Sequence, residues 1–472
     1  MGGPASLIYH ARHARHAKHA HGGTSSSSLS ALVDRDTVVE ASRLATWVFR
    51  RSPERTYETP YRDIDVEHVT MSSSVDPQRP APPLSEAPAF LRRNLDAAID
   101  VALMGVRRAA VMTGGGLDSS VLLGLATRWA ERTGGSAFAV SLDYEAEGDD
   151  RPHLAALERH LGCEVLRVTP EDAAGRISLM STGADAAPAG FATMPMEVEM
   201  LVRAREHGAE RVLSGAGGDE MFGGDPQALA DVALRGHPVR AVRSARRLSG
   251  FGRARAPAWS WVMRPLIVRS APTAFRAWRA RRRPVAPAPA WAGPVGRAFL
   301  DEKQRAARVV PARPRTAAER FTSVRDDAHR VVLAWARHQE EHASGVDCWD
   351  PYLDLDLTAA VASLPPEYLL YGDRWRGLLR AAAHDLLPES LRERMDKASF
   401  EPALRRWTDA AGGLEALRPL SSGRELAALG LVEPKPFAAA FERFVATPED
   451  GVSWVSLWSA LSVEAFLRAR AR

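Results

Sequence analysis

Short apolar runs alternate with segments of helical apolar spacing through the first half of the chain. The runs of strand length are 109–112, 137–142, 164–168 and 211–213. Helical spacing appears over 90–103, 120–129 and 153–161. Strands that alternate with helices indicate a mostly parallel sheet with helices on both faces. Beyond Pro226 the spacing is mainly helical. The pattern therefore predicts an α/β fold with a mainly helical C-terminal part.

The first 88 residues differ from the rest of the chain. Residues 1–30 are rich in histidine, alanine and serine, a composition that predicts a disordered tail. Residues 31–88 hold one helix-like stretch, 33–51, and end in a Pro-rich linker from position 77. This leader is too short for an independent domain. We expect the linker to separate it from the main unit, residues 89–472.

Composition excludes several classes of protein. No apolar run approaches the roughly 20 residues that a membrane span requires, and we expect a cytoplasmic protein without a spanning segment. The two cysteines, Cys163 and Cys348, are too few for a disulfide framework or a four-thiolate metal site, and core positions are expected for both.

Basic residues are concentrated in one segment. No acidic residue occurs between Asp231 and Asp301, whereas fifteen arginines lie in 235–297. The local field is positive, so the segment either docks something anionic or forms solvated helix faces; the sequence leaves both interpretations open. Nucleic acid is disfavoured as a partner, although Trp259 and Trp278 lie among the arginines.

Two glycine-rich turns follow predicted strands. In the first, Gly114, Gly115 and Gly116 precede a helix, so backbone N–H groups and the helix N-terminus can approach a phosphate. The hydroxyls of Ser119 and Ser120 can donate to the same oxygens. No Gly-Lys-Ser/Thr follows, which excludes a Walker loop.

The acidic residues of these turns suggest a cation. Asp118 would be repelled by a phosphate unless a cation lay between them. The second turn, 214–220, places Asp219 at another strand end. Two carboxylates at adjacent strand ends can share Mg²⁺, so Asp118 and Asp219 are the predicted metal ligands. The alternative is that aspartate is an ordinary turn residue in both places.

These motifs resemble the asparagine synthetase superfamily. Its Ser-Gly-Gly-Leu-Asp-Ser-Ser loop corresponds to 114–120, and its Ser-Gly-Glu-Gly-Ala-Asp-Glu-x-Phe-Gly-Gly motif to 214–224. Segments 345–354 and 378–400 are similar to two further signatures. The likeness covers roughly residues 90 to 410. It implies a parallel-sheet PP-loop (adenine nucleotide α-hydrolase-like) domain that uses ATP and Mg²⁺.

The resemblance also implies site residues. The loop from Gly114 to Ser120 is expected to hold pyrophosphate, and four residues to line the adenosine site: Met112, Val140, Ser214 and Gly215. Lys397 matches an active-centre lysine of the family. Lysine is rare here, at four of 62 basic residues, which independently supports a role for Lys397 alongside Asp118 and Asp219.

Departures from the family shift the expected substrate. Position 2 is glycine rather than the catalytic cysteine of glutamine-dependent members, so we expect no glutaminase activity and interpret 31–88 as a truncated remnant of that domain. Where the family motif has glutamate, this chain has Ala216, and where the motif then has alanine, this chain has Gly218. With the run 148–153 and the Arg-rich segment, this pattern resembles lasso-peptide isopeptide-forming cyclases.

Three hypotheses follow. The first is an ATP-dependent ligase that adenylates a carboxylate of a precursor peptide and closes a macrolactam, with the precursor peptide and its leader-processing proteins as partners. The second is an amidoligase that uses ammonia, or one that forms a small-molecule lactam. The third is a nucleotide-binding partner protein without catalysis. Gly114 in place of serine and the altered run Asp347-Cys348-Trp349 are further departures.

Overall fold

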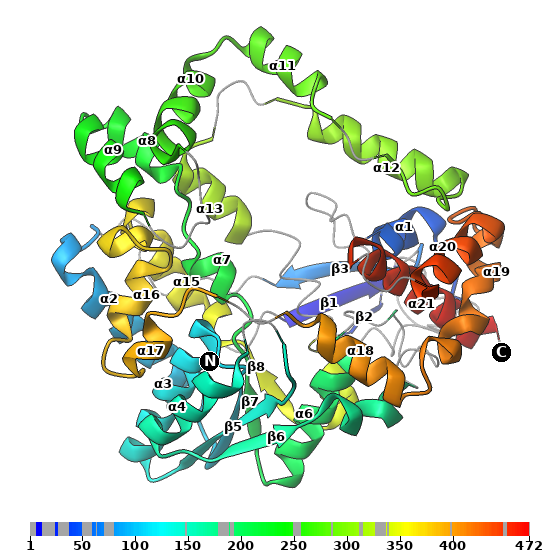
Figure 1. Ribbon diagram of the computed structural model, residues 1–472, viewed down its shortest axis with the longest axis horizontal. Coiled ribbons are helices and arrows are strands. Elements are labelled where there is room, and N and C mark those ends of the chain that lie inside the picture. The colour runs from blue at the N-terminus through cyan, green and yellow to red at the C-terminus, as the bar shows by residue number, and fades with distance from the viewer. Residues whose placement is uncertain are drawn as a thin grey trace.

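The computed structural model describes residues 6–11, 24–26, 37–49, 59–62, 64–69, 80–146, 149–177, 188, 193–248, 256–284, 287–310, 315–325, 337, 339–396, 399–446 and 451–471. A parallel sheet with its covering helices forms one part, and a helical C-terminal body lies beside it (Figure 1). An arc of helices runs from the first part to the second (Figure 1).

The central sheet has five parallel strands in the order β6-β5-β4-β7-β8. Their bounds are Val165–Val168 (β6), Ser136–Leu142 (β5), Arg108–Met112 (β4), Arg211–Leu213 (β7) and Asp347–Trp349 (β8). The four strands expected from the sequence are confirmed. The strand β8 was missed, because Asp347-Cys348-Trp349 contains no apolar run and, unlike the equally short β7, is not followed by a glycine-rich turn.

Helices cover both faces of this sheet, as predicted. Side chains of α2 (Ala87–Ala102) and α3 (Leu117–Thr133) pack on the face that bears Val111 and Leu213. The helix α6 (Met194–Glu206) packs on the opposite face, against Ala110 and Val212. Strands buried on both faces need apolar residues at successive positions, and they therefore appear in the sequence as continuous apolar runs.

The C-terminal body is helical. It contains α18 (Glu401–Ala410), η7 (Leu414–Ser422), α19 (Arg424–Ala428), α20 (Pro434–Ala446) and α21 (Gly451–Ala471). Its core includes Trp407 and Trp458, whose rings meet edge to face at 5.4 Å.

The N-terminal leader packs into that body. Helix α1 (Ala41–Phe49) buries Leu44 and Val48 in the same core, and Arg470 donates from Nη1 to the hydroxyl of Tyr61 at 3.1 Å. The prediction that the leader is separate from the rest is therefore wrong. Its apolar stripe is too short to form a core alone and is buried against helices distant in the sequence.

A second, antiparallel sheet is formed near the N-terminus. Its order is β2-β1-β3, with bounds Thr24–Ser26, Ser6–Ala11 and Ile64–Val69. Strand β1 pairs along its whole length with β3, from Ser6 opposite Val69 to Ala11 opposite Ile64. The prediction of disorder is thus wrong for 6–11 and 24–26. Their backbone N–H and C=O groups form hydrogen bonds with a neighbouring strand, and composition gives no sign of such a pairing.

The Arg-rich segment forms most of the helical arc. In order these helices are α8 (Ala228–Leu234), α9 (Pro238–Arg247), the π-helix η4 (Trp259–Met263), α10 (Arg264–Ser270), α11 (Thr273–Arg281) and α12 (Pro294–Ala307). The last of them contacts α1, where Phe299 stacks on Phe49.

One sequence expectation on composition is met by the described residues. Both cysteines are buried and free, as expected for core positions. Within the part of the chain that the structure describes, no helix combines the length and the apolar character needed to cross a bilayer.

Candidate functional site

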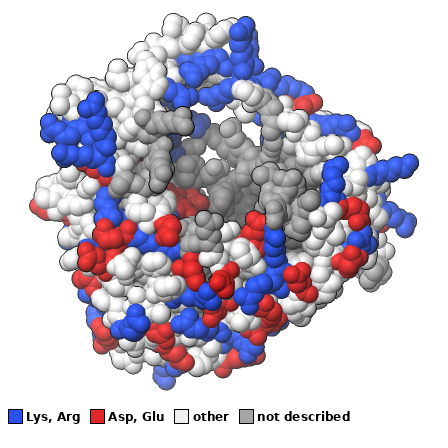
Figure 2. Space-filling model, viewed as in Figure 1, with Lys and Arg blue, Asp and Glu red and all other residues white. Residues whose placement is uncertain are grey.

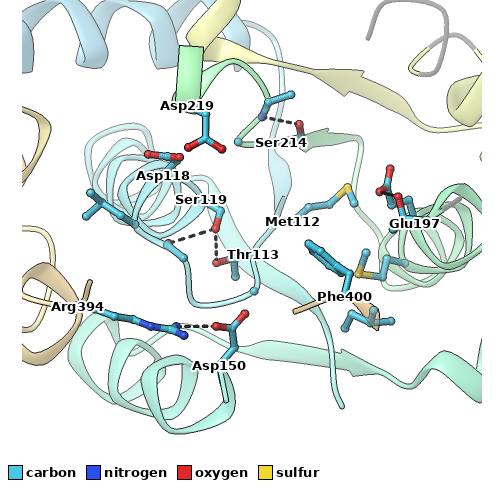
Figure 3. Close-up of a pocket in the computed structure, with 18 of the residues that line it drawn as sticks. Met112, Thr113, Asp118, Ser119, Asp150, Glu197, Ser214, Asp219, Arg394 and Phe400 are labelled. Atoms are coloured by element: carbon cyan, nitrogen blue, oxygen red, sulfur yellow. Dashed lines mark hydrogen bonds and ion pairs between the residues drawn. The ribbon is translucent and has the colours of Figure 1, made fainter. Parts of the chain in front are cut away.

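A cavity of about 890 Å³ opens at the carboxyl ends of β4 and β7. Figure 3 shows both glycine turns on its wall, with Asp118 and Asp219 on one side and Met112 and Phe400 on another. Parallel strands place their following loops at one edge of the sheet, which is why turns a hundred residues apart meet here.

Arg394 and Asp150 hold the first turn in its conformation. Gly115 has φ +81, a left-handed conformation that favours glycine, and Arg394 donates to its carbonyl oxygen at 3.1 Å. The same Arg394 Nη1 donates to Asp150 Oδ1 at 2.6 Å. Burial raises the pKa of Asp150 even though Arg394 lowers it. Burial and the charge of Arg394 also lower the pKa of His153.

The second turn interlocks with the first. A Cβ at Gly215 would lie 3.3 Å from the backbone N of Ser119, and one at Gly218 would lie 2.6 Å from Cγ of Asp118. Gly217 has φ +86. The second turn needs glycine at these positions because it approaches Ser119 and Asp118 of the first, so the position of Asp118 depends on the second turn.

One arginine joins the two predicted metal ligands. Arg376 donates from Nη1 to Asp118 Oδ2 at 2.5 Å, and its Nη2 is ion-paired with Asp219. Its guanidinium lies 4.2 Å from the ring centroid of Trp375. Arg376 precedes α16 (Gly377–Ala382) with φ 53, and Tyr352 donates to the backbone oxygen of Asp118 at 2.7 Å. We call Asp118, Arg376 and Asp219 the Arg376 cluster.

A second arginine joins carboxylates deeper in the wall. Arg337 Nη2 donates to Asp350 Oδ1 at 2.8 Å, and its Nη1 to Glu340 Oε2 at 2.5 Å. Ser214 Oγ donates to the same Asp350 oxygen at 2.6 Å and accepts from Arg337 and from the N–H of Ala216. We call Ser214, Arg337, Glu340 and Asp350 the Arg337 cluster.

Burial dominates the electrostatics of this second cluster. It raises the pKa of Glu340 well above its usual value, with a further contribution from Glu197, while Arg337 opposes the rise. The pKa of Arg337 is also raised, because Asp350 and Glu340 outweigh the effect of its burial. Burial therefore favours the protonated form of Glu340, whereas the neighbouring carboxyl groups favour the charged form of Arg337.

Part of the remaining wall is apolar. It is formed by Met112, Leu142, Met196, Met200 and Phe400. The ring of Phe400 stacks on Tyr144 at 6.3 Å between centroids, and burial raises the pKa of Tyr144 to about 12. Flat apolar surface beside a glycine turn suits a purine ring whose phosphates lie on the turn.

Comparison with known proteins identifies the family. The model of the family described as "Asparagine synthase" matches residues 90–468, most of the chain. This chain belongs to that family. Among curated protein sequences, none matches it. Membership in the asparagine synthase family, with the glycine turn, supports an ATP-dependent ligase.

Three solved structures share parts of the fold. NMN synthetase from Francisella tularensis is 18% identical, with a TM-score of 0.21, over 30% of this chain and 58% of its own. NAD+ synthetase from Burkholderia pseudomallei is 23% identical, TM-score 0.20, over 32% and 59%. The U34-tRNA thiolase NcsA from Methanococcus maripaludis is 13% identical, TM-score 0.25, over 56% and 88%. The match spans less than two thirds of the first two proteins' length.

The structure brings most of the predicted site residues together. The cavity is lined by Met112, Gly114, Gly116, Asp118, Ser119, Ser214, Gly215 and Asp219. Gly115 is buried within its turn. The other two do not reach the cavity: Val140 lies in the core between the sheet and α6, and Ser120 is fully buried on α3. A direct contact of either side chain with the nucleotide is therefore not supported.

Lys397 lies outside the described residues. Its neighbours in sequence, Asp396 and Phe400, line the cavity. Sequence reasoning missed Arg376 and Arg337, because each is one of many arginines and carries no local signal. Arg394 could have been found, since it lies three residues before Lys397 in a signature of the asparagine synthase family.

The carboxylates fit a magnesium ion only in part. Within the described residues, no group of three or more His, Cys, Asp or Glu side chains could hold a metal. Mg²⁺ commonly takes one or two carboxylates and completes its shell with phosphate oxygens and water, which Asp118 and Asp219 allow. In the structure their charge is balanced by Arg376.

Proposed function

We propose that this member of the asparagine synthase family is an ATP-dependent carbon–nitrogen ligase that adenylates a carboxylate, releases pyrophosphate and transfers the acyl group to an amine. The observation that carries the proposal is the convergence of two interlocked glycine turns, two carboxylates and an apolar wall on one cavity of about 890 Å³.

The chain offers a separate place for each part of ATP. Backbone N–H groups of 114–119 and the N-terminus of the 17-residue helix α3 would hold the phosphates. The adenine would lie on the wall that contains Met112 and Phe400. Asp118 and Asp219 would hold Mg²⁺, which supplies positive charge to the departing pyrophosphate.

The arginines of the cavity wall would stabilise the negative charge that develops during the reaction. A carboxylate oxygen of the substrate attacks the α-phosphorus and the bond to pyrophosphate breaks. The amine then attacks the acyl carbon, loses a proton, and AMP departs. Arg376 and Arg380 line the cavity, so their guanidinium groups can balance charge on these anions. Burial and neighbouring arginines lower the pKa of Arg380 to about 10. We assign the acyl-transfer step to Lys397.

For the substrate we propose a lasso-type precursor peptide, whose own amine attacks its activated side-chain carboxylate. Two features support this choice. Ala216 stands where the family motif has glutamate, next to the wall, and the cavity lies at the large end of the range for small-molecule sites, which is about 300–1,000 Å³. Holding both ends of one peptide makes the second step intramolecular. Leader-processing proteins would be the partners.

Magnesium-dependent exchange of labelled pyrophosphate into ATP, with a candidate precursor peptide, tests adenylation. We expect exchange in the wild type and its loss in Asp219→Ala. The matched control is Asp100→Ala, because the Asp100 side chain is similarly exposed, 47% against 53%, but lies on α2 outside the cavity. If the Asp219→Ala variant retains pyrophosphate exchange, Asp219 is not a magnesium ligand.

The product mass distinguishes the substrates. Ring closure removes one water from the peptide, whereas amidation by ammonia replaces a hydroxyl with an amino group. The alternatives remain an ammonia-using or small-molecule lactam-forming amidoligase, if ammonia or a small amine replaces the peptide, and a non-catalytic nucleotide-binding protein, if no exchange occurs with any carboxylate.

A further inference from the structure

The helices η4, α10 and α11 expose large apolar side chains. The exposed fractions are 53% for Trp259, 45% for Met263, 51% for Ile267, 48% for Phe275 and 48% for Trp278. We call residues 256–283 the basic arm. Trp259, Met263 and Ile267 follow each other at intervals of four residues and therefore lie along one side of the helix. Val262 and Pro265, on the other side, are buried.

Two of these rings are already arranged as a unit. Phe275 and Trp278 stack with centroids 5.6 Å apart and an angle of 26° between planes. The guanidinium of Arg282 lies 4.4 Å from the ring centroid of Trp278. A cation over an exposed aromatic ring presents positive charge and apolar surface to the same partner.

The charge of the arm has one sign. Acidic residues are absent from the sequence between Asp231 and Asp301, and the arm alone contains seven arginines. Two of them turn inward: Arg269 pairs with Asp231, and Arg276 is buried. The exposed ones are Arg264, Arg279, Arg281, Arg282 and Arg283. Figure 2 shows basic side chains gathered over the upper arc of helices, where few acidic ones appear.

The exposed side chains of the arm belong to neither described cavity. The catalytic cavity is lined by other elements, and a second one, of about 240 Å³, lies beside α8, α9 and η6 (Pro366–Asp373) without a residue of the arm. The arm is thus a surface of projecting side chains, which fits a broad partner better than a small molecule.

We infer that the basic arm docks this protein on the surface of a lipid bilayer that carries anionic headgroups. Trp and Phe rings prefer the interface between headgroups and acyl chains, and guanidinium groups pair with headgroup phosphates. A helix with an exposed apolar side and arginines can lie in the plane of that interface without spanning it. Nucleic acid explains less, because Met263 and Ile267 offer aliphatic chains that do not stack on bases.

Co-sedimentation of the full chain with vesicles tests the docking. We expect binding to vesicles of equal parts phosphatidylglycerol and phosphatidylcholine, little binding to phosphatidylcholine alone, and weaker binding as salt rises. Replacing both tryptophans, Trp259→Ser with Trp278→Ser, should weaken binding by about 10-fold. The triple change Arg279→Gln, Arg281→Gln and Arg282→Gln should weaken it by about 100-fold.

Matched controls lie elsewhere on the surface. Met104→Ser with Val309→Ser removes two residues that are exposed by 69% and 77% outside the arm. The change of Arg159, Arg405 and Arg424 to Gln removes three exposed charges. Both should bind as the wild type does. Failure of the wild type to bind anionic vesicles, or equal loss in arm and control variants, would overturn the proposal. So would tighter binding to single-stranded RNA or polyglutamate than to the vesicles.

Discussion

Two clusters of the same chemistry stand in one wall of the cavity. The Arg376 cluster and the Arg337 cluster each hold an arginine between two acidic side chains. They differ in the solvent exposure of one carboxylate, Asp219, since Arg376 and Asp118 are themselves exposed by only 6% and 14%. The Asp219 side chain is 53% exposed, whereas the three side chains of the Arg337–Asp350–Glu340 group are exposed by 14%, 12% and 2%.

The difference in burial predicts different roles for the two clusters. An arginine between two buried carboxylates cannot leave them, because water does not replace the lost charge. An arginine beside an open carboxylate can be exchanged for another cation when a ligand brings one. We therefore expect the Arg337 cluster to hold the second glycine turn in place and the Arg376 cluster to respond to Mg²⁺ and phosphate.

The largest expected effect is on stability, from Arg337→Met. It leaves Asp350 and Glu340 buried without their shared cation, at a cost of about 3–5 kcal/mol in the free energy of unfolding. Urea denaturation measures it. Adding Asp350→Asn should restore part of the loss, since the two changes act on one pair. A loss under about 1 kcal/mol would show that the cluster does not support the fold.

The matched change in the other cluster, Arg376→Gln, should cost less, about 1–2 kcal/mol, because Asp219 reaches solvent. It should also lower the Mg²⁺ concentration at which a thermal shift is half complete, since the arginine no longer competes for Asp118 and Asp219. Arg132→Gln, in a surface pair with Asp100, is the control. An unchanged or higher Mg²⁺ midpoint would contradict the exchange of one cation for the other.

A smaller effect is expected from Glu340→Gln and depends on pH. Because burial raises the pKa of Glu340, the folded protein binds its proton at pH values where the unfolded chain, near pKa about 4.3, has lost it. The wild type thus loses stability as pH rises above that value, by up to about 1.4 kcal/mol per pH unit, and the glutamine variant does not. Denaturation midpoints of the two proteins should diverge as the pH rises above about 5. Parallel curves would mean that Glu340 is ionised when folded.

The smallest effect is expected from Tyr352→Phe. This change removes the hydrogen bond to the backbone of Asp118 and leaves the buried ring in place. Unfolding should become easier by about 0.5–1.5 kcal/mol. Pyrophosphate exchange should fall only a few-fold, because Gly218 still limits where Asp118 can lie. Exchange as low as in Asp219→Ala would instead make Tyr352 part of the catalytic apparatus.

Periodicity was enough for the main sheet but not for the chain's ends. Four of its five strands and the helices over 120–129 and 153–161 follow from local patterns, which are apolar runs and, for the three-residue β7, the glycine turn after it. The β1–β3 pairing and the burial of α1 in the C-terminal core could not be predicted in this way. Both depend on partners more than fifty residues away, and local pattern carries no information about which distant surface completes a core.

The candidate site shows the same division. Glycine spacing located Asp118, Ser119 and Asp219, because a turn that approaches a phosphate needs glycine wherever it occurs, and the family resemblance located Ser214. Glycine spacing also suggested Ser120, and the family resemblance suggested Val140. Both side chains point into the core, since a one-residue step along a helix or strand changes the face. Arg337 and Arg376 were invisible for the opposite reason: an arginine gains its role only from the carboxylates that surround it.

By itself, then, the sequence determined the α/β class, the two turns, the family and the positive charge of the arc, all of which rest on local spacing and composition. Tertiary structure alone decided which arginine faces which carboxylate, that the leader joins the C-terminal core, and that the aromatic side chains of the basic arm remain exposed. Burial and pairing are properties of contacts between distant segments, and these are fixed only when the chain is packed.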